Sequence, residues 1–190
     1  MNMDINFRKI FLISLIIALS ISALIGIYIF LAGNFGDTES KLLLTTLSVG
    51  GYSLTGLCSA TIQKQNNLKW FSILGMLIST TGFLITIGTI WEFFDFNDIW
   101  KTFIIFIILP IAFAHISLLL QIKPKTTYAK LSLVWTIIFI SIVALMLVTS
   151  TLTEFRESET FFRLLGVFSI LDVLGTIVTP ILNRIPVKKN

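Results

Sequence analysis

Charge is what this sequence has least of. Only 13% of its 190 residues are Asp, Glu, Lys or Arg, whereas 55% are hydrophobic. A water-soluble domain carries roughly twice that share of charged residues, because it must cover its surface with polar groups. The apolar residues are also gathered into long runs. The composition therefore excludes a soluble globular domain and predicts an integral membrane protein.

Cysteine and histidine are almost absent, with one residue of each, Cys58 and His115. A single cysteine inside an apolar run excludes an intramolecular disulfide and a cysteine-based metal site. A single histidine excludes a haem held by two histidines of one chain. The sequence also lacks a Ser-His-Asp arrangement, a phosphate-binding glycine loop, the HExxH zinc motif and nucleic-acid-binding motifs. We expect no enzyme activity, no cofactor, no metal site and no nucleic-acid partner.

Six apolar runs of about twenty residues follow one another, each long enough to cross a bilayer as a helix. None alternates apolar and polar residues with the period of two that a membrane barrel requires. The first run is too long for a signal peptide, so we expect it to stay as a helix. The prediction is an all-α membrane protein, a six-transmembrane-helix bundle forming one domain over residues 1–190. Its predicted helices cover residues 9–32, 41–62, 69–90, 101–122, 131–152 and 162–183.

Basic residues divide unevenly between the two ends of these helices. Ten of the fourteen lie at one end: Arg8, Lys9, Lys64, Lys69, Lys123, Lys125, Lys130, Arg184, Lys188 and Lys189. The other end holds only Lys41, Lys101, Arg156 and Arg163. Since Lys and Arg concentrate in cytoplasmic loops, we expect both the N- and the C-terminus to be cytoplasmic. The expected location is a bacterial-type cytoplasmic cell membrane, which the chain crosses several times.

The same basic residues recur at a regular interval. Lys9, Lys69 and Lys130 open the odd-numbered predicted helices and stand about sixty residues apart. The pattern predicts three helical hairpins, either as diverged internal repeats or as similar hairpins that share only the positive-inside constraint.

Polar residues recur at helical spacing inside the even-numbered helices and should face other helices rather than lipid. The second helix carries Thr45, Ser48, Tyr52, Thr55 and Ser59. The sixth carries Ser169, Asp172, Thr176, Thr179 and Asn183. The fourth carries Pro110, Ala114, Ser117 and Gln121, with His115 beside them. We therefore expect the even-numbered helices to form the core, Pro110 to kink the fourth, and the uniformly bulky fifth helix to face lipid.

Asp172 is the only carboxylate deep inside a predicted span, and ionisable residues at that depth mark functional sites by default. Counted along the helices, Tyr52 lies near its depth, and His115 and Thr55 lie about 7 Å closer to the cytoplasm. With Thr176, these residues form a candidate ligand or proton pathway. The alternative is a neutral Asp172 that bonds Tyr52 or Thr176 and only holds the helices in register.

Two kinds of function remain. The first is a small polytopic protein that acts through helix packing as an accessory, sensory or assembly component. Its expected partners are the lipid bilayer and either another membrane protein or a second copy of the chain. The alternative is a small transporter or channel, or a lipid- or quinone-binding protein, with a polar pathway between the second, fourth and sixth helices.

Overall fold

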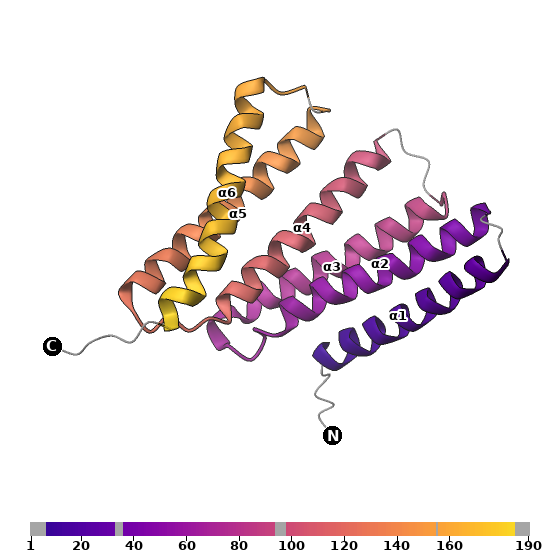
Figure 1. The fold of residues 1–190 in the computed structure, drawn as a ribbon, viewed down its shortest axis with the longest axis horizontal. Coiled ribbons are helices and arrows are strands. Elements are labelled where there is room, and N and C mark those ends of the chain that lie inside the picture. The colour runs from indigo at the N-terminus through magenta and orange to yellow at the C-terminus, as the bar shows by residue number, and fades with distance from the viewer. Residues whose placement is uncertain (1–6, 33–35, 94–97, 155, 185–190) are drawn as a thin grey trace. The chain divides into compact units, whose positions relative to one another are not determined.

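The computed structural model describes residues 7–32, 36–93, 98–154 and 156–184, and in them the regular structure is helical. The helices, drawn in Figure 1, are α1 (Phe7–Ala32), α2 (Asp37–Ala60), the short 3-10 helix η1 (Asn66–Leu68), α3 (Lys69–Ile90), α4 (Ile99–Leu120), α5 (Thr127–Leu152) and α6 (Glu159–Arg184). All six α-helices are long and apolar enough to cross a membrane. The prediction of an all-α chain with six such helices is confirmed.

Two helices begin four residues before their predicted starts, because the helix continues beyond the apolar run into polar residues that suit a helix N-terminus. In α2 the first turn contains Asp37 and Glu39, whose negative charge is favourable there. In α5 the backbone N–H of Ala129 donates to the hydroxyl of Thr126, the N-cap residue, at 3.0 Å.

The end of α3 is fixed by a turn that apolar patterning does not reveal. Glu92 has a left-handed backbone with φ of 56°. Its N–H donates to the carbonyl of Thr89 at 3.3 Å, and the N–H of Phe93 donates to that of Gly88 at 2.8 Å. These two bonds form the Schellman motif, which satisfies carbonyl groups at the helix C-terminus. Glu154, just after α5, has the same backbone conformation, with φ of 57°.

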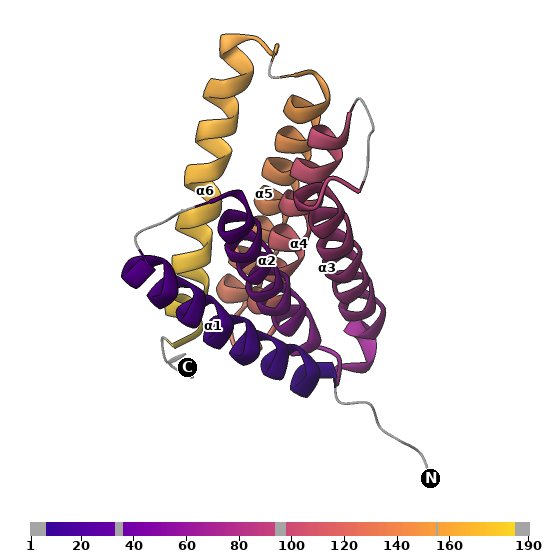
Figure 2. The ribbon, with the colours of Figure 1, turned by 90° about the vertical axis from the view of Figure 1, so that its right-hand side faces the viewer.

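The chain consists of two compact units, Met1–Pro110 and Ile111–Asn190, and the boundary falls within α4 directly after Pro110. In the first unit α2 packs against both α1 and α3, as Figure 1 and the turned view in Figure 2 show. In the second unit α5 and α6 pack against each other. These contacts are consistent with hairpins formed by α1 with α2 and by α5 with α6. The third hairpin and the single domain stay predictions.

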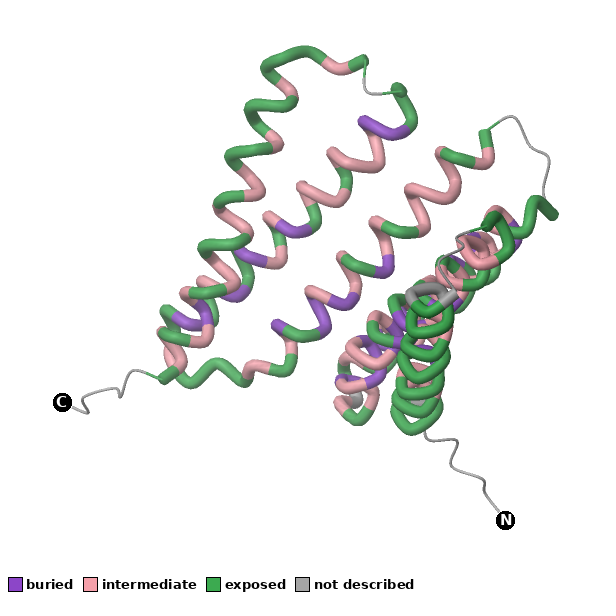
Figure 3. The backbone as a smooth tube through the Cα atoms, turned by 45° about the vertical axis from the view of Figure 1, so that its right-hand side comes forward, coloured by how far each residue is buried: buried purple, intermediate pink, exposed green. Residues whose placement is uncertain are grey.

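A glycine allows the close approach of α1 to α2. Gly56 is buried on α2, and a β-carbon built there would collide with the ring of Phe11 on α1. The outward sides of the helices carry large exposed apolar side chains, among them Leu19 and Leu24 of α1. In Figure 3, which colours the backbone by burial, exposed positions recur along α6 from one end to the other. Faces of this kind suit a lipid environment.

The prediction that the fifth helix faces lipid is wrong for one of its sides. Leu133, Thr136 and Ile140 of α5 are buried, and Thr136 lies against Gly175 of α6, where a β-carbon would collide with its side chain. Among the described side chains of α6, by contrast, only Thr179 is buried. Bulky residues alone did not identify the lipid-facing side, because small polar residues such as Thr136 pack tightly between helices.

Candidate functional site

A ladder of polar contacts joins α2 to α3 in the first unit. The contacts between side chains are Trp91 Nε1 to Thr45 Oγ1 at 3.1 Å, Tyr52 Oη to Thr86 Oγ1 at 2.7 Å and Thr55 Oγ1 to Ser79 Oγ at 3.1 Å. Further along, the hydroxyl of Ser72 donates to the backbone carbonyl of Ser59 at 2.7 Å. Of the predicted polar stripe, the side chains of Tyr52 and Thr55 therefore bond α3, and that of Thr45 bonds Trp91 directly after it. At Ser59 the backbone carbonyl makes the contact, and the buried hydroxyl has no hydrogen-bond partner among the described residues.

Tyr52 has a second contact that the sequence did not predict. Pro110 of α4 has no N–H, so the carbonyl of Phe106, four residues earlier, loses its usual helical donor. The hydroxyl of Tyr52 donates to this carbonyl at 3.1 Å. Gly82 of α3 makes the approach feasible, because a β-carbon there would lie 2.7 Å from the Tyr52 ring and 2.8 Å from the Phe106 oxygen. Tyr52 of α2 thus supplies the hydrogen bond that Pro110 removes from the Phe106 carbonyl of α4.

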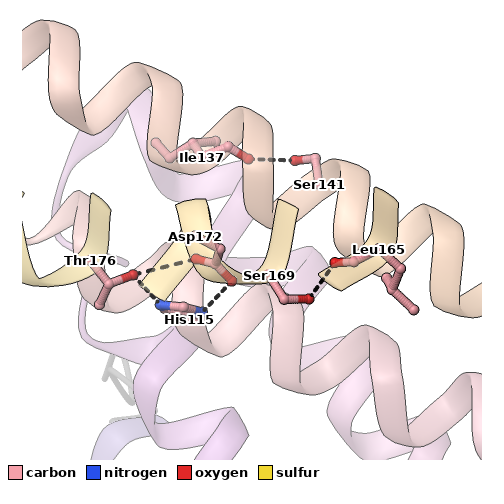
Figure 4. A network of polar contacts seen from close by, with 7 residues as sticks. All are labelled: His115, Ile137, Ser141, Leu165, Ser169, Asp172 and Thr176. Atoms are coloured by element: carbon pink, nitrogen blue, oxygen red, sulfur yellow. Dashed lines mark hydrogen bonds and ion pairs between the residues drawn. The ribbon is translucent and has the colours of Figure 1, made fainter. Parts of the chain in front are cut away.

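The second unit holds a cluster of ionisable and polar side chains, drawn in Figure 4. Nε2 of His115 on α4 lies 2.9 Å from Oγ1 of Thr176 on α6. The Thr176 hydroxyl donates to Oδ1 of Asp172, one helical turn earlier, at 3.4 Å. Nδ1 of His115 lies 4.0 Å from Oδ2 of the same carboxyl group. The three side chains therefore close a ring in which each nitrogen of the imidazole faces one oxygen atom.

The cluster is covered mainly by protein. The Asp172 side chain is 13% exposed and the His115 side chain 31% exposed. Nearby hydroxyls are engaged within their own helices: Ser169 donates to the carbonyl of Leu165 and Ser141 to that of Ile137, both at 2.8 Å. The carboxyl group of Asp172 thus depends on His115 and Thr176 for its polar contacts in the described part of the chain.

Further polar contacts, between α5 and α6, lie on the C-terminal side of the Asp172 cluster. The hydroxyls of Ser132 and Thr179 lie 2.8 Å apart, and the side-chain oxygen of Asn183 accepts a hydrogen bond from the backbone N–H of Lys125 at 2.7 Å. Thr136 fits against Gly175, one helical turn from the Ser132–Thr179 contact on the side of Asp172. Polar residues therefore fix the position of α6, and with it that of Asp172, relative to α5.

The five residues predicted as one pathway fall into two groups. Asp172, His115 and Thr176 meet in the second unit, and Tyr52 and Thr55 belong to the first, where they contact Thr86 and Ser79. The predicted bond from Asp172 to Thr176 is present. Residue counting placed His115 about 7 Å from the depth of Asp172, because such counting ignores the relative tilt of two helices. The lone histidine beside a polar stripe was the signal for the pair.

The chemistry open to the cluster is proton exchange and hydrogen bonding. The described residues contain no group of three His, Cys, Asp or Glu side chains placed to hold a metal ion. Imidazole is the side chain that ordinarily gains and loses a proton near neutral pH, and carboxyl groups join histidines in the proton relays of membrane proteins. The chain matches no known protein-family model, no curated protein and no solved structure. Any assignment of function therefore rests on the sequence and geometry of the chain itself.

Proposed function

We propose that this chain is a multi-pass protein of a bacterial-type cytoplasmic membrane, with six spans and both termini in the cytoplasm. Six helices of membrane-spanning length support the proposal. Ten of the fourteen basic residues lie on the side assigned to the cytoplasm. The proposed topology assigns the acidic loop residues Glu92, Asp98, Glu154 and Glu157 to the other side.

Single-cysteine labelling tests this orientation. Cys58 is first replaced by Ser, which removes the one native thiol. New cysteines are then introduced one at a time at Lys64, Lys123, Asp98 and Glu157. A membrane-impermeant maleimide added to intact cells should label positions 98 and 157 and should reach positions 64 and 123 only after the cells are opened. The opposite pattern would overturn the orientation.

The function best supported by the geometry is that of an accessory, sensory or assembly component acting through helix packing. The observation that supports this proposal is that several polar side chains inside the helices bond a neighbouring helix. Examples are Tyr52 with Thr86 in the first unit and Thr179 with Ser132 in the second. Polar contacts of this kind hold membrane helices together. Large apolar side chains cover the outward faces, where lipid or another membrane protein would lie.

Gentle purification from native membranes, followed by mass spectrometry of all co-eluting molecules, tests this function. An accessory or assembly component should bring a partner protein in fixed stoichiometry, and Leu24→Trp on the exposed side of α1 should weaken a partner that binds there. A chain that elutes alone, as a monomer and without partner, would contradict the accessory and assembly forms and would leave the sensory form.

A second candidate is a small carrier in which Asp172 is the titrating group. The specific observation that favours it is the pair formed by Asp172 and His115, since transporters and pumps place such pairs along proton paths. Asp172→Asn should then abolish proton uptake into proteoliposomes and leave the folded fraction of the protein nearly unchanged. Glu159→Gln, at the exposed start of α6, is the matched control. Unfolding by Asp172→Asn alone would indicate a structural role instead.

A further inference from the structure

We propose that Asp172, His115 and Thr176 form a binding site for a single proton, held between α4 and α6. The inference deepens the sensory form of the proposed function and rests on it in one respect, that these helices lie in a membrane. A site of this kind would let the contact between the two helices respond to pH.

The proposed site assigns one proton to Nε2 of the His115 imidazole. A hydroxyl group has one hydrogen to donate, and that of Thr176 points to Oδ1 of Asp172. In the proposed site the contact of 2.9 Å between Thr176 Oγ1 and His115 Nε2 then has Nε2 as its donor. His115 is thereby held as the tautomer with hydrogen on Nε2. Its second nitrogen, Nδ1, is the one left to gain or lose a proton.

The other two polar atoms of the cluster, one on His115 and one on Asp172, face each other as hydrogen-bond acceptors. Nδ1 of His115 and Oδ2 of Asp172 lie 4.0 Å apart. Without a proton between them, a neutral imidazole faces a carboxylate, and the cluster carries one negative charge. One proton, on either atom, gives a cluster without net charge. A second proton would leave one positive charge, so the cluster is neutral only with a single proton bound.

No other charge lies near enough inside these helices to replace that proton. The part of α4 in the second unit contains His115 as its sole titratable residue. In α5, which packs against α6, the titratable residues are Tyr128 and Lys130, both in the first turn. In α6 itself Glu159, Arg163 and Arg184 lie near the two ends, at least nine residues from Asp172. A net charge on the cluster would remain uncompensated in an apolar environment, which strongly disfavours it.

Proton release would weaken the contact between α4 and α6. The neutral cluster joins the helices by an attraction between imidazole and carboxyl group, as an ion pair or as a shared proton. The deprotonated cluster instead places two lone pairs opposite each other and draws water towards the carboxylate. The bound proton thus controls how firmly these two helices hold together at the level of Asp172.

The single histidine makes the site directly measurable. The full chain, with 15N-labelled histidine and 13C-labelled aspartate, would be placed in lipid nanodiscs and titrated from acidic to alkaline pH by NMR. We expect Nε2 to stay protonated throughout. The Nδ1 signal and the carboxyl carbon of Asp172 should shift in one transition with a common midpoint. A histidine with its proton on Nδ1, or two transitions with separate midpoints, would overturn the proposal, as would no transition at all.

Two pairs of variants separate a proton site from a merely structural contact. Thr176→Val should release Nε2 and yield a mixture of tautomers, whereas Thr176→Ser keeps the hydroxyl and should restore the single tautomer. Asp172→Asn should change the pH dependence of the His115 signals, and Glu159→Gln should leave it unchanged. Unchanged spectra in Thr176→Val and Asp172→Asn would refute the site.

Failure of the proton site can be distinguished from failure of the proposed function. Cysteine labelling reports the membrane orientation whatever His115 does, and the proton titration of the wild-type chain requires no transport activity and no partner. A shared titration in a protein without uptake activity would support the proton site and exclude the carrier.

Discussion

The hydroxyl of Tyr52 lies 3.1 Å from the carbonyl oxygen of Phe106, the oxygen left without a helical donor by Pro110. A carbonyl group exposed by a proline inside an apolar span costs free energy, because no water is present to bond it. Here a residue of α2 supplies the missing donor to α4. The hydroxyl of Thr86 lies 2.7 Å from the same Tyr52 oxygen and can donate to it in turn. Three helices thereby meet at one phenol group.

Removing this hydroxyl should destabilise the protein. We expect Tyr52→Phe to lower the free energy of unfolding by about 1–2 kcal/mol, because it leaves the Phe106 carbonyl without a donor. The measurement is reversible unfolding in detergent micelles, followed by circular dichroism.

The dependence on proline is tested by a double-mutant cycle. Pro110→Ala restores a backbone N–H that can bond the Phe106 carbonyl within α4. In that background Tyr52→Phe should cost clearly less than in the wild-type chain. An equal cost in both backgrounds would show that the tyrosine acts through Thr86 or through packing instead.

Gly82 should be intolerant of any side chain. We expect Gly82→Ala to cost about 1–3 kcal/mol, because the added β-carbon would lie 2.7 Å from the Tyr52 ring and 2.8 Å from the Phe106 oxygen. Gly51→Ala is the matched control in the same unit, since nothing lies within 4 Å of its β-carbon. Thermal unfolding of the two variants checks the difference. Equal melting temperatures would mean that Tyr52 moves aside freely.

The sequence predicted the helices well, because a run of apolar residues of bilayer length has no other structure open to it in lipid. It also predicted which side of α2 faces a neighbour, from the spacing of Tyr52, Thr55 and Ser59. It did not predict which helix that neighbour is, because periodicity shows which residues share one side of a helix and not what packs against that side. Tyr52 and Thr55, expected near Asp172, bond α3 instead.

The pairing of Asp172 with His115 was likewise beyond sequence analysis. Helical counting gives the approximate depth of each residue and neither the tilt nor the rotation of its helix. Gly175 illustrates the same limit on α6: its role became evident only once Thr136 of α5 was seen beside it. Contacts between helices depend on such local fits of one side chain against another helix, and these leave no regular spacing in the sequence.

The fit of Thr136 against Gly175 gives a further prediction. Gly175→Ala should push α5 and α6 apart and lower the free energy of unfolding by about 1–3 kcal/mol. Gly166→Ala, on the same helix, has nothing within 4 Å and should be neutral or slightly stabilising, because alanine is the better helix former. Chemical denaturation of both variants in micelles checks the contrast. A destabilised Gly166→Ala together with an unaffected Gly175→Ala would contradict this packing.

The ion pair between Lys41 and Glu92 should respond to acid. The Lys41 ammonium donates to the Glu92 carboxylate at 2.9 Å, and this bond, followed by the attraction of opposite charges, lowers the pKa of Glu92 below its ordinary value of 4.5. The ion pair therefore stabilises the fold at pH values above the ordinary pKa, and this contribution is lost as the pH falls through the lowered pKa. Glu92 is largely exposed, so the contribution is small and salt-sensitive.

Carbon NMR of the Glu92 carboxyl group measures this pKa directly. Lys41→Met should raise it towards 4.5, while Arg163→Met, which disrupts the ion pair with Glu159 on α6, should not change it. A Glu92 pKa that is the same with and without Lys41 would show that the two side chains are separated by solvent.

The polar ladder on α2 also bears on how the chain is made. The hydroxyls of Thr45 and Thr55 bond carbonyls of α2 itself as well as their neighbours, whereas the Tyr52 hydroxyl bonds residues of α3 and α4. If α2 left the translocation machinery before α3 had been synthesised, the Tyr52 hydroxyl would therefore face lipid without a partner. A polar group without a partner makes a helix a poor substrate for release into a bilayer. Biosynthesis should therefore hold α2 at the exit channel until α3 emerges, so that the two helices enter the lipid together.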